Sequence, residues 1–460
     1  MASKGKDPLK RLYNELHSIV EGQEARMAQL QRPDSQEELQ NDVAQLWAVL
    51  GKIDALQTPA AASQPVDKAE RGKAFREWFL QHAPESHLGK RCDFDWHLPE
   101  GSGVVALQDL DEGEQFLAVP RRLILSADTA FASTCGAVLA RDNICTQMPS
   151  LALAVFVALE RHNSESFWKP YLDILPTSFL LPLWFDAQTL QHLEGSPILY
   201  DVLRLKKSTM RQYDHLHRLL KKSGFADMSY RDFLWGVSVV MTRQNRIPKR
   251  GKPDDYVLAL IPGWDMCNYA DGKITTFFDG LRDESQSAVM KPVKKGEQIY
   301  IYYGDRTNWK LFVFSGFVYE AHPNDAVEFL YGMTPEDPLL KLKMSMLAKR
   351  KFKPREVFSA PSSGDISSKL LDYARLCVMD KEDAAIALKH PEQAVLGPAN
   401  EKRALQSLLD RYTEVLKAYP TSIEQDDALL QADDISPALR LVIRLRRTEK
   451  RLLARGLESL

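Results

Sequence analysis

The sequence has few cysteines and no pattern that would organise them. A zinc cluster or a disulfide framework needs cysteines that are closely spaced or paired in number, so we expect neither, and we expect no metal site. Free thiols are typical of a reducing compartment, which predicts a cytoplasmic protein. The five cysteines among the 460 residues are scattered, without a CxC or CxxC pair: Cys92, Cys135, Cys145, Cys267 and Cys377.

The sequence also lacks an excess of either charge and lacks long apolar runs. It has 60 basic and 62 acidic residues, a net charge of −2, whereas nucleic-acid-binding domains carry a basic excess. The longest clean apolar run, residues 151–159, is far shorter than the about 20 residues that span a membrane. The first residues, MASKGKD, are polar, unlike a signal peptide. We expect a soluble intracellular protein that binds neither nucleic acid nor membrane.

What is present first is a helical segment, residues 1–57. Apolar residues recur there at three- and four-residue steps, which predicts one apolar face, and Ser35 with Glu38 can form a capping box at the start of a second helix. We interpret the segment as a helical hairpin that packs on the next domain. A partner-binding coiled coil is the alternative, although sustained heptads are missing. Residues 58–65 are small and polar with a proline near each end, which indicates a linker.

The region that follows is rich in β-strand signals. A helix is predicted over residues 67–82, and short strands between residues 93 and 119. The GxG within residues 100–103 is a weak signal, because a dinucleotide-binding GxG should open a helix. Residues 104–107, VVAL, predict a strand instead, so we reject a dinucleotide site. Residues 126–236 are mostly helical in pattern.

Three segments carry the most specific signal. Residues 256–261, YVLALI, predict a buried strand, and residues 262–269, PGWDMCNY, follow it. Residues 295–304, KGEQIYIYYG, predict a turn and an alternating strand that ends at Tyr-Gly. With residues 241–245, MTRQN, this combination resembles the SET-domain methyltransferases, in the group of the Rubisco large-subunit methyltransferase. Within that group it is similar to the animal branch that methylates histidine in actin.

The resemblance implies an α+β fold. It would comprise a β-rich SET domain over residues 66–327, with the helical insert at about 126–236, and an all-helical substrate-binding domain over residues 328–460. It also implies a monomer that takes S-adenosylmethionine as methyl donor, without a metal. Residues 262–269 and 295–304 would cross and build the donor site and the methyl-transfer channel.

The resemblance assigns donor-binding roles to three stretches and to isolated arginines. Arg243 would meet the donor carboxylate, because arginine pairs bidentately with carboxylates. The family usually has His after the Asn, where this chain has Tyr269. If this position contacts the donor mainly through its backbone, little affinity for the donor is lost; if the side chain takes part, the affinity falls. The register around Arg71 is unclear. The residues assigned to the donor are Glu100, Gly101, Ser102, Arg243, Asp265, Met266, Cys267, Asn268, Tyr269, Ser315, Gly316 and Phe317, with Arg71 as a further candidate.

The acceptor is a nitrogen with a free lone pair. Lysine, with a reference pKa of about 10.4, must first lose a proton, whereas histidine, at about 6.5, is mostly neutral at pH 7 and needs one tautomer fixed. By resemblance, the Asn245 carbonyl fixes the tautomer and Tyr303 lines the transfer channel. Trp264 would form a wall of the pocket, and Arg306 and Arg211 would hold the peptide.

These assignments predict methylation of Nε2 of a histidine in actin. A lysine methyltransferase of the same SET group and a non-catalytic peptide-binding module remain alternatives, although Tyr303 argues against the latter. Single residues also have structural alternatives: a salt bridge for Arg243, a local cap for Asn245, a packed strand tyrosine for Tyr303 and plain core for Phe317.

The last part of the chain has clear helix signals. Thr421 with Glu424 predicts a capping box, and Ser436 followed by Pro437 predicts another helix start. The basic residues beyond it are expected to form a solvated face rather than a nucleic-acid patch. They are Arg444, Arg446, Arg447, Lys450, Arg451 and Arg455.

Overall fold

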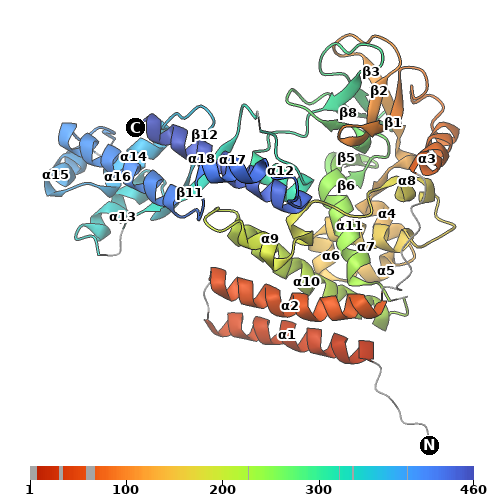
Figure 1. Cartoon of the computed structure of the whole chain (residues 1–460), viewed down its shortest axis with the longest axis horizontal. Helices are drawn as coiled ribbons and strands as arrows, with labels where there is room; N and C mark the ends of the chain where they lie inside the picture. Colours follow the sequence, from red (N-terminus) through yellow and green to blue (C-terminus); the bar gives the residue numbers. More distant parts are fainter. Residues whose placement is uncertain are drawn as a thin grey trace, which may run out of the picture. The chain divides into compact units, whose positions relative to one another are not determined.

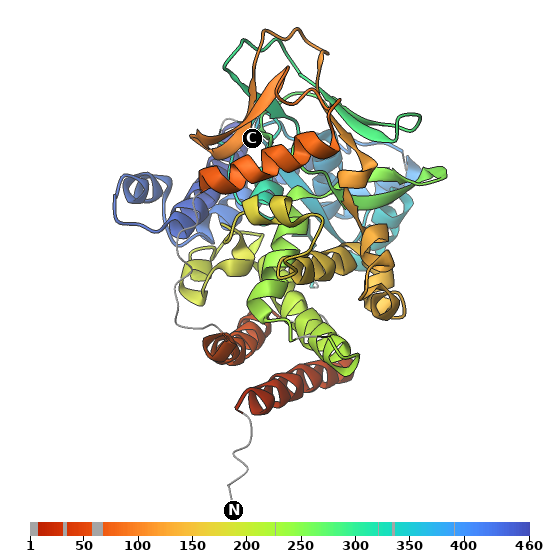
Figure 2. The same ribbon diagram turned by 90° about the vertical axis from the view of Figure 1, so that its right-hand side faces the viewer.

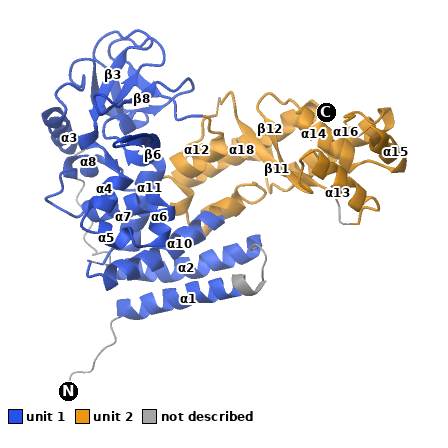
Figure 3. Cartoon of the chain, turned by 180° about the vertical axis from the view of Figure 1, so that it is seen from behind, with its two compact units in different colours: residues 1–179, 203–304 blue, residues 180–202, 305–460 orange. Residues whose placement is uncertain are grey.

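A computed structural model describes residues 8–30, 35–57, 68–225, 227–320, 322–333, 336–390 and 392–460. The chain forms two compact units (Figure 3). Unit 1 comprises Met1–Phe179 and Leu203–Gly304, and unit 2 comprises Leu180–Val202 and Asp305–Leu460. Part of the predicted helical insert therefore groups with the carboxyl-terminal residues. The predicted linker 58–65 lies outside the described residues, and the predicted boundaries at residues 66 and 328 stay predictions.

Unit 1 begins with the helical hairpin. Its helices are α1 (Pro8–Leu30) and α2 (Gln36–Gln57). The predicted capping box is confirmed, because the Ser35 backbone N–H donates to Glu38 Oε2 at 2.7 Å and the Glu38 N–H donates to Ser35 Oγ at 3.2 Å. The hairpin packs on α10 (Leu199–Lys222), where the hydroxyls of Tyr13 and Tyr213 lie 3.0 Å apart. The interpretation as a packed hairpin is confirmed.

The predicted helical character of residues 126–236 is confirmed. In α7 (Pro149–Glu160), residues Leu151 to Ala158 are all buried. This helix packs against α11 (Tyr230–Arg243), where Gly236 permits close approach. A Cβ at that glycine would lie 2.3 Å from the carbonyl oxygen of Ala154. The helices before and within this stretch are α3 (Lys68–His82), α4 (Ala127–Ala132), α5 (Gly136–Leu139), α6 (Asn143–Gln147), α7 (Pro149–Glu160), α8 (Lys169–Ile174), α9 (Ala187–Gln191), α10 and α11 (Tyr230–Arg243).

Three small sheets complete unit 1, with strand orders β1-β2-β10-β7, β3-β9-β8 and β4-β6-β5. The strands gather at one end of this unit and the α1–α2 hairpin lies at the other (Figures 1 and 2). Strand β10 pairs antiparallel with β2 and parallel with β7. The strands are β1 (Cys92–Leu98), β2 (Gly101–Ala106), β3 (Gln115–Pro120), β4 (Leu125–Ser126), β5 (Asn245–Lys249), β6 (Lys252–Leu260), β7 (Asn268–Tyr269), β8 (Thr276–Asp279), β9 (Glu284–Ala288) and β10 (Gln298–Ile301).

Unit 2 is mainly helical but contains a two-stranded antiparallel sheet, so the prediction of an all-helical domain needs correction. Strand β11 (Ala326–Gly332) pairs with β12 (Arg355–Pro361). Val327, Phe329 and Tyr331 alternate into the core, which is the period of a strand rather than a helix. Besides α9, the helices of unit 2 are α12 (Asn308–Ser315), α13 (Leu340–Lys349), α14 (Ser368–Cys377), α15 (Lys381–Lys389), α16 (Pro398–Lys417), α17 (Ile423–Leu430) and α18 (Pro437–Glu458). The α+β class as a whole is confirmed.

The starts of the last two helices bear out one prediction and correct another. Ser436 caps α18 by accepting from the Leu439 N–H, with Pro437 at the first helical position. The capping box of α17 is formed by Ser422 with Gln425, one residue later than predicted. The Thr421 hydroxyl is occupied elsewhere, because it donates to Asp426 Oδ1 at 3.0 Å.

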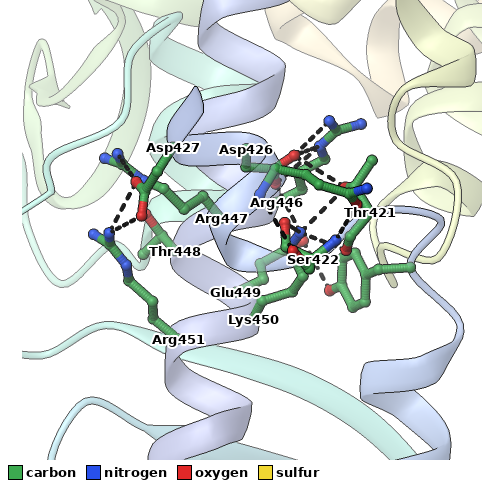
Figure 4. A network of polar contacts seen from close by, with 12 residues as sticks. Thr421, Ser422, Asp426, Asp427, Arg446, Arg447, Thr448, Glu449, Lys450 and Arg451 are labelled. Atoms are coloured by element: carbon green, nitrogen blue, oxygen red, sulfur yellow. Dashed lines mark hydrogen bonds and ion pairs between the residues drawn. The ribbon is translucent and has the colours of Figure 1, made fainter. Parts of the chain in front are cut away.

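The basic residues of α18 are not all on a solvated face, and this expectation was wrong for two of them. The side chains of Arg446 and Lys450 are 1% and 2% exposed, and both pair with the fully buried Asp426 (Figure 4). The Lys450 ammonium also donates to the Thr421 carbonyl at 2.7 Å and to the Ser422 carbonyl at 2.8 Å. A buried charge needs such partners because desolvation is costly, so this network ties α17 to α18.

Candidate active site

The segment after β6 turns sharply and leads into the short strand β7. Gly263 has φ +83, and a Cβ there would lie 3.0 Å from the Phe79 ring, so this position needs glycine. A 3-10 helix, η3 (Trp264–Met266), follows. Strand β7 then pairs in parallel with β10, with Asn268 opposite Tyr300. The two segments that the sequence predicted to cross are therefore adjacent.

Asn268 is held in one orientation by polar neighbours. Its Nδ2 donates to the Ser102 carbonyl at 3.0 Å and to Gln298 Oε1 at 2.7 Å. Gln298 is oriented in turn, because its Nε2 donates to Glu100 Oε2 at 3.1 Å. With both amide hydrogens committed, Asn268 Oδ1 remains as an acceptor. A Cβ on Gly103 would lie 2.6 Å from Gln298 Oε1. The absence of a side chain at this position therefore leaves room for the hydrogen bond between Gln298 and Asn268.

Gly101 begins the turn with φ +106, and a Cβ there would meet nothing within 4 Å. The structure brings together Glu100, Ser102 and Asn268 from the predicted donor set, through hydrogen bonds that Asn268 and Gln298 make.

Tyr303 lies just after β10. Its hydroxyl donates to the carbonyl of Cys267 at 2.9 Å, and its ring meets the Tyr269 ring edge to face, with centroids 5.4 Å apart. Burial raises the pKa of the Cys267 thiol well above its usual range, so this cysteine is neutral. The tyrosine that the sequence placed in the channel is thus fixed by the same segment that carries Asn268.

Arg243, Asp265 and Tyr171 form a buried group beside η3. Arg243 Nη1 donates to the Asp265 carbonyl at 2.6 Å and lies 3.6 Å from Asp265 Oδ2. The Tyr171 hydroxyl donates to the same Oδ2. Burial raises the pKa of Asp265, which the Arg243 charge and the Tyr171 hydrogen bond oppose. The structural alternative for Arg243, a salt bridge, is therefore present.

Some polar atoms of this group have no hydrogen-bond partner among the described residues. They are Arg243 Nε, Gln244 Oε1 and Asp265 Oδ1, all buried. Buried polar atoms are normally paired, and a ligand with both donor and acceptor groups would fit them. Met266, which η3 places next to Asp265, is 4% exposed and adds an apolar side chain.

Trp264 and Asn245, the predicted acceptor-side residues, have partners of their own. Trp264 Nε1 donates to Thr276 Oγ1 at 2.8 Å, which links η3 to β8. Asn245 is the first residue of β5, and its Oδ1 accepts from the Arg246 backbone N–H at 2.7 Å. The local cap foreseen as an alternative for Asn245 is formed. A carbonyl oxygen has a second lone pair, so one acceptor position remains.

Two arginines predicted to bind ligands contact residues of unit 1 that are not in the predicted site. Arg71, in α3, donates from Nη1 to the Asp173 carbonyl at 3.1 Å. Arg211, in α10, pairs with Glu24 of α1. Their assigned roles stay predictions, and for Arg211 a peptide contact would compete with an ion pair to the hairpin.

Four further predicted residues belong to unit 2. Arg306 Nη1 donates to Ser315 Oγ at 3.3 Å, and Phe317 is partly buried. Gly316 ends α12 in the left-handed conformation with φ +80, where a Cβ would lie 2.8 Å from the Leu180 carbonyl oxygen. The donor and peptide roles of these residues stay predictions.

Comparisons with known proteins give the fold a name. The chain is similar in structure to a crystal structure described as the SET domain of LSMT bound to lysine and AdoHcy. The TM-score is 0.68, with 23% sequence identity, and the match covers 85% of this chain and 90% of that one. The chain has the SET-domain fold. The predicted combination of a SET domain with a further helical domain is confirmed, since residues 334–453 match the family model for the Rubisco LSMT substrate-binding domain.

Sequence relatives of this SET-domain chain are also found. It is 34% identical over 380 residues to the actin-histidine N-methyltransferase of Papio anubis, and equally so to that of Homo sapiens. Each match covers 78% of this chain and 64% of the relative. The chain thus spans less than two thirds of the length of these relatives.

Two partners of the SET site were missed by sequence reasoning. Gln298 orients Asn268, and Tyr171 holds Asp265. Gln298 stands in the diagnostic strand, where its alternation with Tyr300 could have indicated a shared face. Tyr171 lies 94 residues from Asp265, and nothing local signals that pairing. In the described residues no helix is long and apolar enough to cross a membrane, and no three His, Cys, Asp or Glu residues cluster as metal ligands would.

Proposed function

We propose that this chain is an S-adenosylmethionine-dependent protein methyltransferase that methylates Nε2 of a histidine in actin. The observation that carries the proposal is that the η3–β7 segment carries Asn268, whose side chain is held by the Ser102 carbonyl, and also accepts the Tyr303 hydroxyl bond at Cys267. A donor-site residue and a channel residue are thereby held at fixed positions, as methyl transfer by alignment requires. The relatives named actin-histidine N-methyltransferase support the same reaction.

The residues of the site suit this donor. S-adenosylmethionine supplies an electrophilic methyl group on a sulfonium. Asn268 Oδ1 offers an acceptor to a cationic group, and the unpaired Arg243 Nε offers a charged donor to a carboxylate. Burial of Met266 and Cys267 keeps water from this part of the site. Binding is measured by titration calorimetry with S-adenosylmethionine, and the absence of binding would contradict the proposal.

Asn245 supports histidine as the acceptor. Its second carbonyl lone pair can accept an imidazole N–H, which directs the other ring nitrogen towards the methyl group. The decisive experiment incubates the chain with S-adenosylmethionine and either whole actin or an actin peptide, and locates the methyl group by mass spectrometry. A modified histidine supports the proposal, whereas a modified lysine or no product contradicts it.

A lysine methyltransferase is the second candidate, and one observation favours it. Asn245 Oδ1 already accepts from the Arg246 N–H, which weakens its hold on an imidazole. The structurally similar LSMT was solved with lysine bound. Matched peptides that differ only in His or Lys at the acceptor distinguish the two candidates. If neither peptide reacts although both bind, the remaining alternative is a non-catalytic peptide-binding module.

The other roles of the chain are proposals as well. Unit 2 would dock the protein substrate, which predicts a lower KM for whole actin than for its peptide, and equal values would contradict docking. We also propose a cytoplasmic monomer that binds actin but neither nucleic acid nor membrane. Light scattering of the purified chain and imaging of a tagged chain in cells test the oligomeric state and the location.

A further inference from the structure

Tyr171 comes from α8, far in sequence from the segments of the SET site. Its side chain is fully buried, and its ring packs near Phe75, with centroids 6.1 Å apart. The hydroxyl reaches Asp265 Oδ2. Since a buried tyrosine hydroxyl needs a partner, this contact fixes both side chains.

Asp265 in turn connects two parts of the SET site. Its carbonyl accepts from Arg243 Nη1 at 2.6 Å, and its carboxylate faces the same guanidinium at 3.6 Å. It is also the central residue of η3, between Trp264 and the strand segment that anchors Tyr303 through Cys267. A shift of this carboxylate would therefore move both Arg243 and the wall of the acceptor pocket.

We propose that Tyr171 is a positioning residue of the methyl-transfer site, which acts by keeping Asp265 ionised and directed at Arg243. The activity test of this inference rests on the proposed function, whereas its stability test does not. In this role the phenol contacts neither the methyl donor nor the methyl acceptor. It sets the charge and the direction of the carboxylate that orients Arg243.

The charged and titratable groups around the carboxylate are few. Arg243 faces it from α11 and Tyr171 from α8, and the pKa of the nearby Cys267 thiol is raised by burial and further by Cys92 and the Asp265 charge. Burial raises the pKa of Tyr171 well above its usual range, so both the phenol and the thiol stay protonated. Asp265 is therefore the group that changes charge when this site is acidified.

The test is Tyr171→Phe in the full chain, because phenylalanine keeps the ring and loses only the hydroxyl. Without that hydrogen bond the pKa of Asp265 rises further, and the acid limb of the methylation rate should move up by about one to two pH units, the equivalent of one hydrogen bond to a charged group. Activity relative to wild type should therefore recover as the pH is raised.

Stability should change with pH in the opposite direction. A folded-state pKa above the unfolded value means stability that is present at low pH and lost as pH rises through the folded pKa. Because Tyr171→Phe raises that folded pKa, its deficit in Tm relative to wild type should be small at low pH and should grow towards high pH. A residue with a purely structural role would lose activity and Tm together.

The matched control is Tyr213→Phe. Tyr213 is also fully buried, and its hydroxyl contacts Tyr13 and the Met228 carbonyl. This variant should lower Tm without moving the pH profile of methylation. A second variant, Asp265→Asn, removes the titrating group, so only the acid limb set by protonation of the acceptor histidine should remain.

The outcomes separate the inference from the proposed function. Opposite pH trends of relative activity and Tm support positioning by Tyr171. A uniform loss at every pH, or the same pH profile for Tyr171→Phe and Tyr213→Phe, overturns it. If wild type shows no methyltransferase activity, the proposed function fails, yet the pH dependence of the Tm deficit still decides whether Tyr171 controls the ionisation of Asp265. If Tyr171→Phe does not fold, a Tm difference between Asp265→Asn and wild type that does not change with pH overturns the inference.

Discussion

The Tyr303 hydroxyl donates its hydrogen bond to the backbone carbonyl of Cys267, 2.9 Å away. Its single hydrogen is thereby committed, and the lone pairs of its oxygen face away from that carbonyl. A phenol oxygen fixed in this way can receive the polarised C–H groups of a methyl in transfer. It also ties the residues after β10 to Cys267, directly before β7, so this hydroxyl would combine its proposed role in the channel with a structural one.

Replacing this hydroxyl should separate turnover from donor binding. In Tyr303→Phe the ring contact with Tyr269 remains, but the oxygen is lost from the transition state. We expect kcat to fall about 10²-fold, as for other single transition-state contacts, while the Kd for S-adenosylmethionine changes little. Steady-state kinetics and calorimetry measure the two quantities.

The exposed Tyr256 supplies the control, and Tyr256→Phe should retain turnover within about twofold, as surface substitutions do. Equal losses in kcat and donor affinity for Tyr303→Phe would assign Tyr303 a structural role.

Acceptor choice should depend on Asn245. Asn245→Ala removes the carbonyl that would fix the imidazole tautomer, so we expect histidine methylation to fall by about 5- to 150-fold, the equivalent of about 1 to 3 kcal/mol for one buried hydrogen bond. The effect should be largest near pH 7, since below about pH 6 protonated histidine is lost as a nucleophile in every variant.

The measurement is the rate on matched His and Lys peptides between about pH 6 and 9, which brackets the histidine reference pKa. A wild type that prefers the Lys peptide, or an unchanged His-to-Lys ratio in Asn245→Ala, contradicts the histidine assignment.

The orientation of Asn268 should be controlled by Gln298. Gln298→Leu removes the acceptor for one hydrogen of the partly buried Asn268 Nδ2. We expect the Kd for S-adenosylmethionine to rise about tenfold from this one lost hydrogen bond. Gln298→Glu keeps an acceptor for Asn268 but places a second carboxylate beside Glu100, so its donor affinity should improve when Glu100→Gln is added.

Calorimetry on the single and double variants tests this coupling. Additive effects of Gln298→Glu and Glu100→Gln would mean that the two side chains act independently.

Unit 2 should be sensitive to loss of a single buried carboxylate. Asp426→Ala leaves Arg446 and Lys450 charged and buried, and burial already lowers the pKa of Lys450. We expect a destabilisation of about 3 to 5 kcal/mol, the range for breaking one side of a buried ion pair, measured by urea unfolding. The neighbouring Asp427, 42% exposed, is the control, and Asp427→Ala should cost less than about 1 kcal/mol. Similar losses of stability for both variants would show that burial of the network does not determine its contribution to the free energy of unfolding.

Glu449 should make the stability of unit 2 depend on pH. Burial raises its pKa to about 7, although Ser196 and Tyr419 each donate to it at 3.0 Å. Because the folded pKa is raised, the stability linked to its proton is present at acidic pH and lost as pH rises through about 7. Glu449→Gln should therefore gain stability relative to wild type above pH 7, on the order of 3 kcal/mol, and gain little near pH 5. Parallel Tm curves for the two proteins across this range would exclude titration of Glu449.

The sequence predicted what depends on neighbours in the chain. The Ser35–Glu38 capping box, the Ser436 cap and the strand before Pro262 all follow from residues a few positions apart. The candidate SET site could be predicted because the residues of its resemblance fall in short contiguous segments. Local patterns of this kind persist in the folded structure, because turns and helix caps depend on interactions between residues that are close in sequence.

What the sequence did not predict depends on distant partners. Arg446 and Lys450 were expected on a solvated face, because nothing local announces that Asp426 lies against them. The strand alternation of β11 was overlooked in a stretch dominated by helical signals. Tyr171 and Asp265 meet only when the helical insert packs beside η3, so their pairing is a property of tertiary structure.

The pairing of β10 with β2 also affects how the chain can fold while it is being made. About 190 residues separate these two strands, so at a synthesis rate of about 5–20 residues per second the edge of β2 waits roughly 10–40 s for its partner. Meanwhile the α1–α2 hairpin and the helices of the insert can form from local contacts. Premature termination between Arg243 and Gln298 would release a chain with a well-formed helical body and an unpaired β2 edge, which is a template for aggregation.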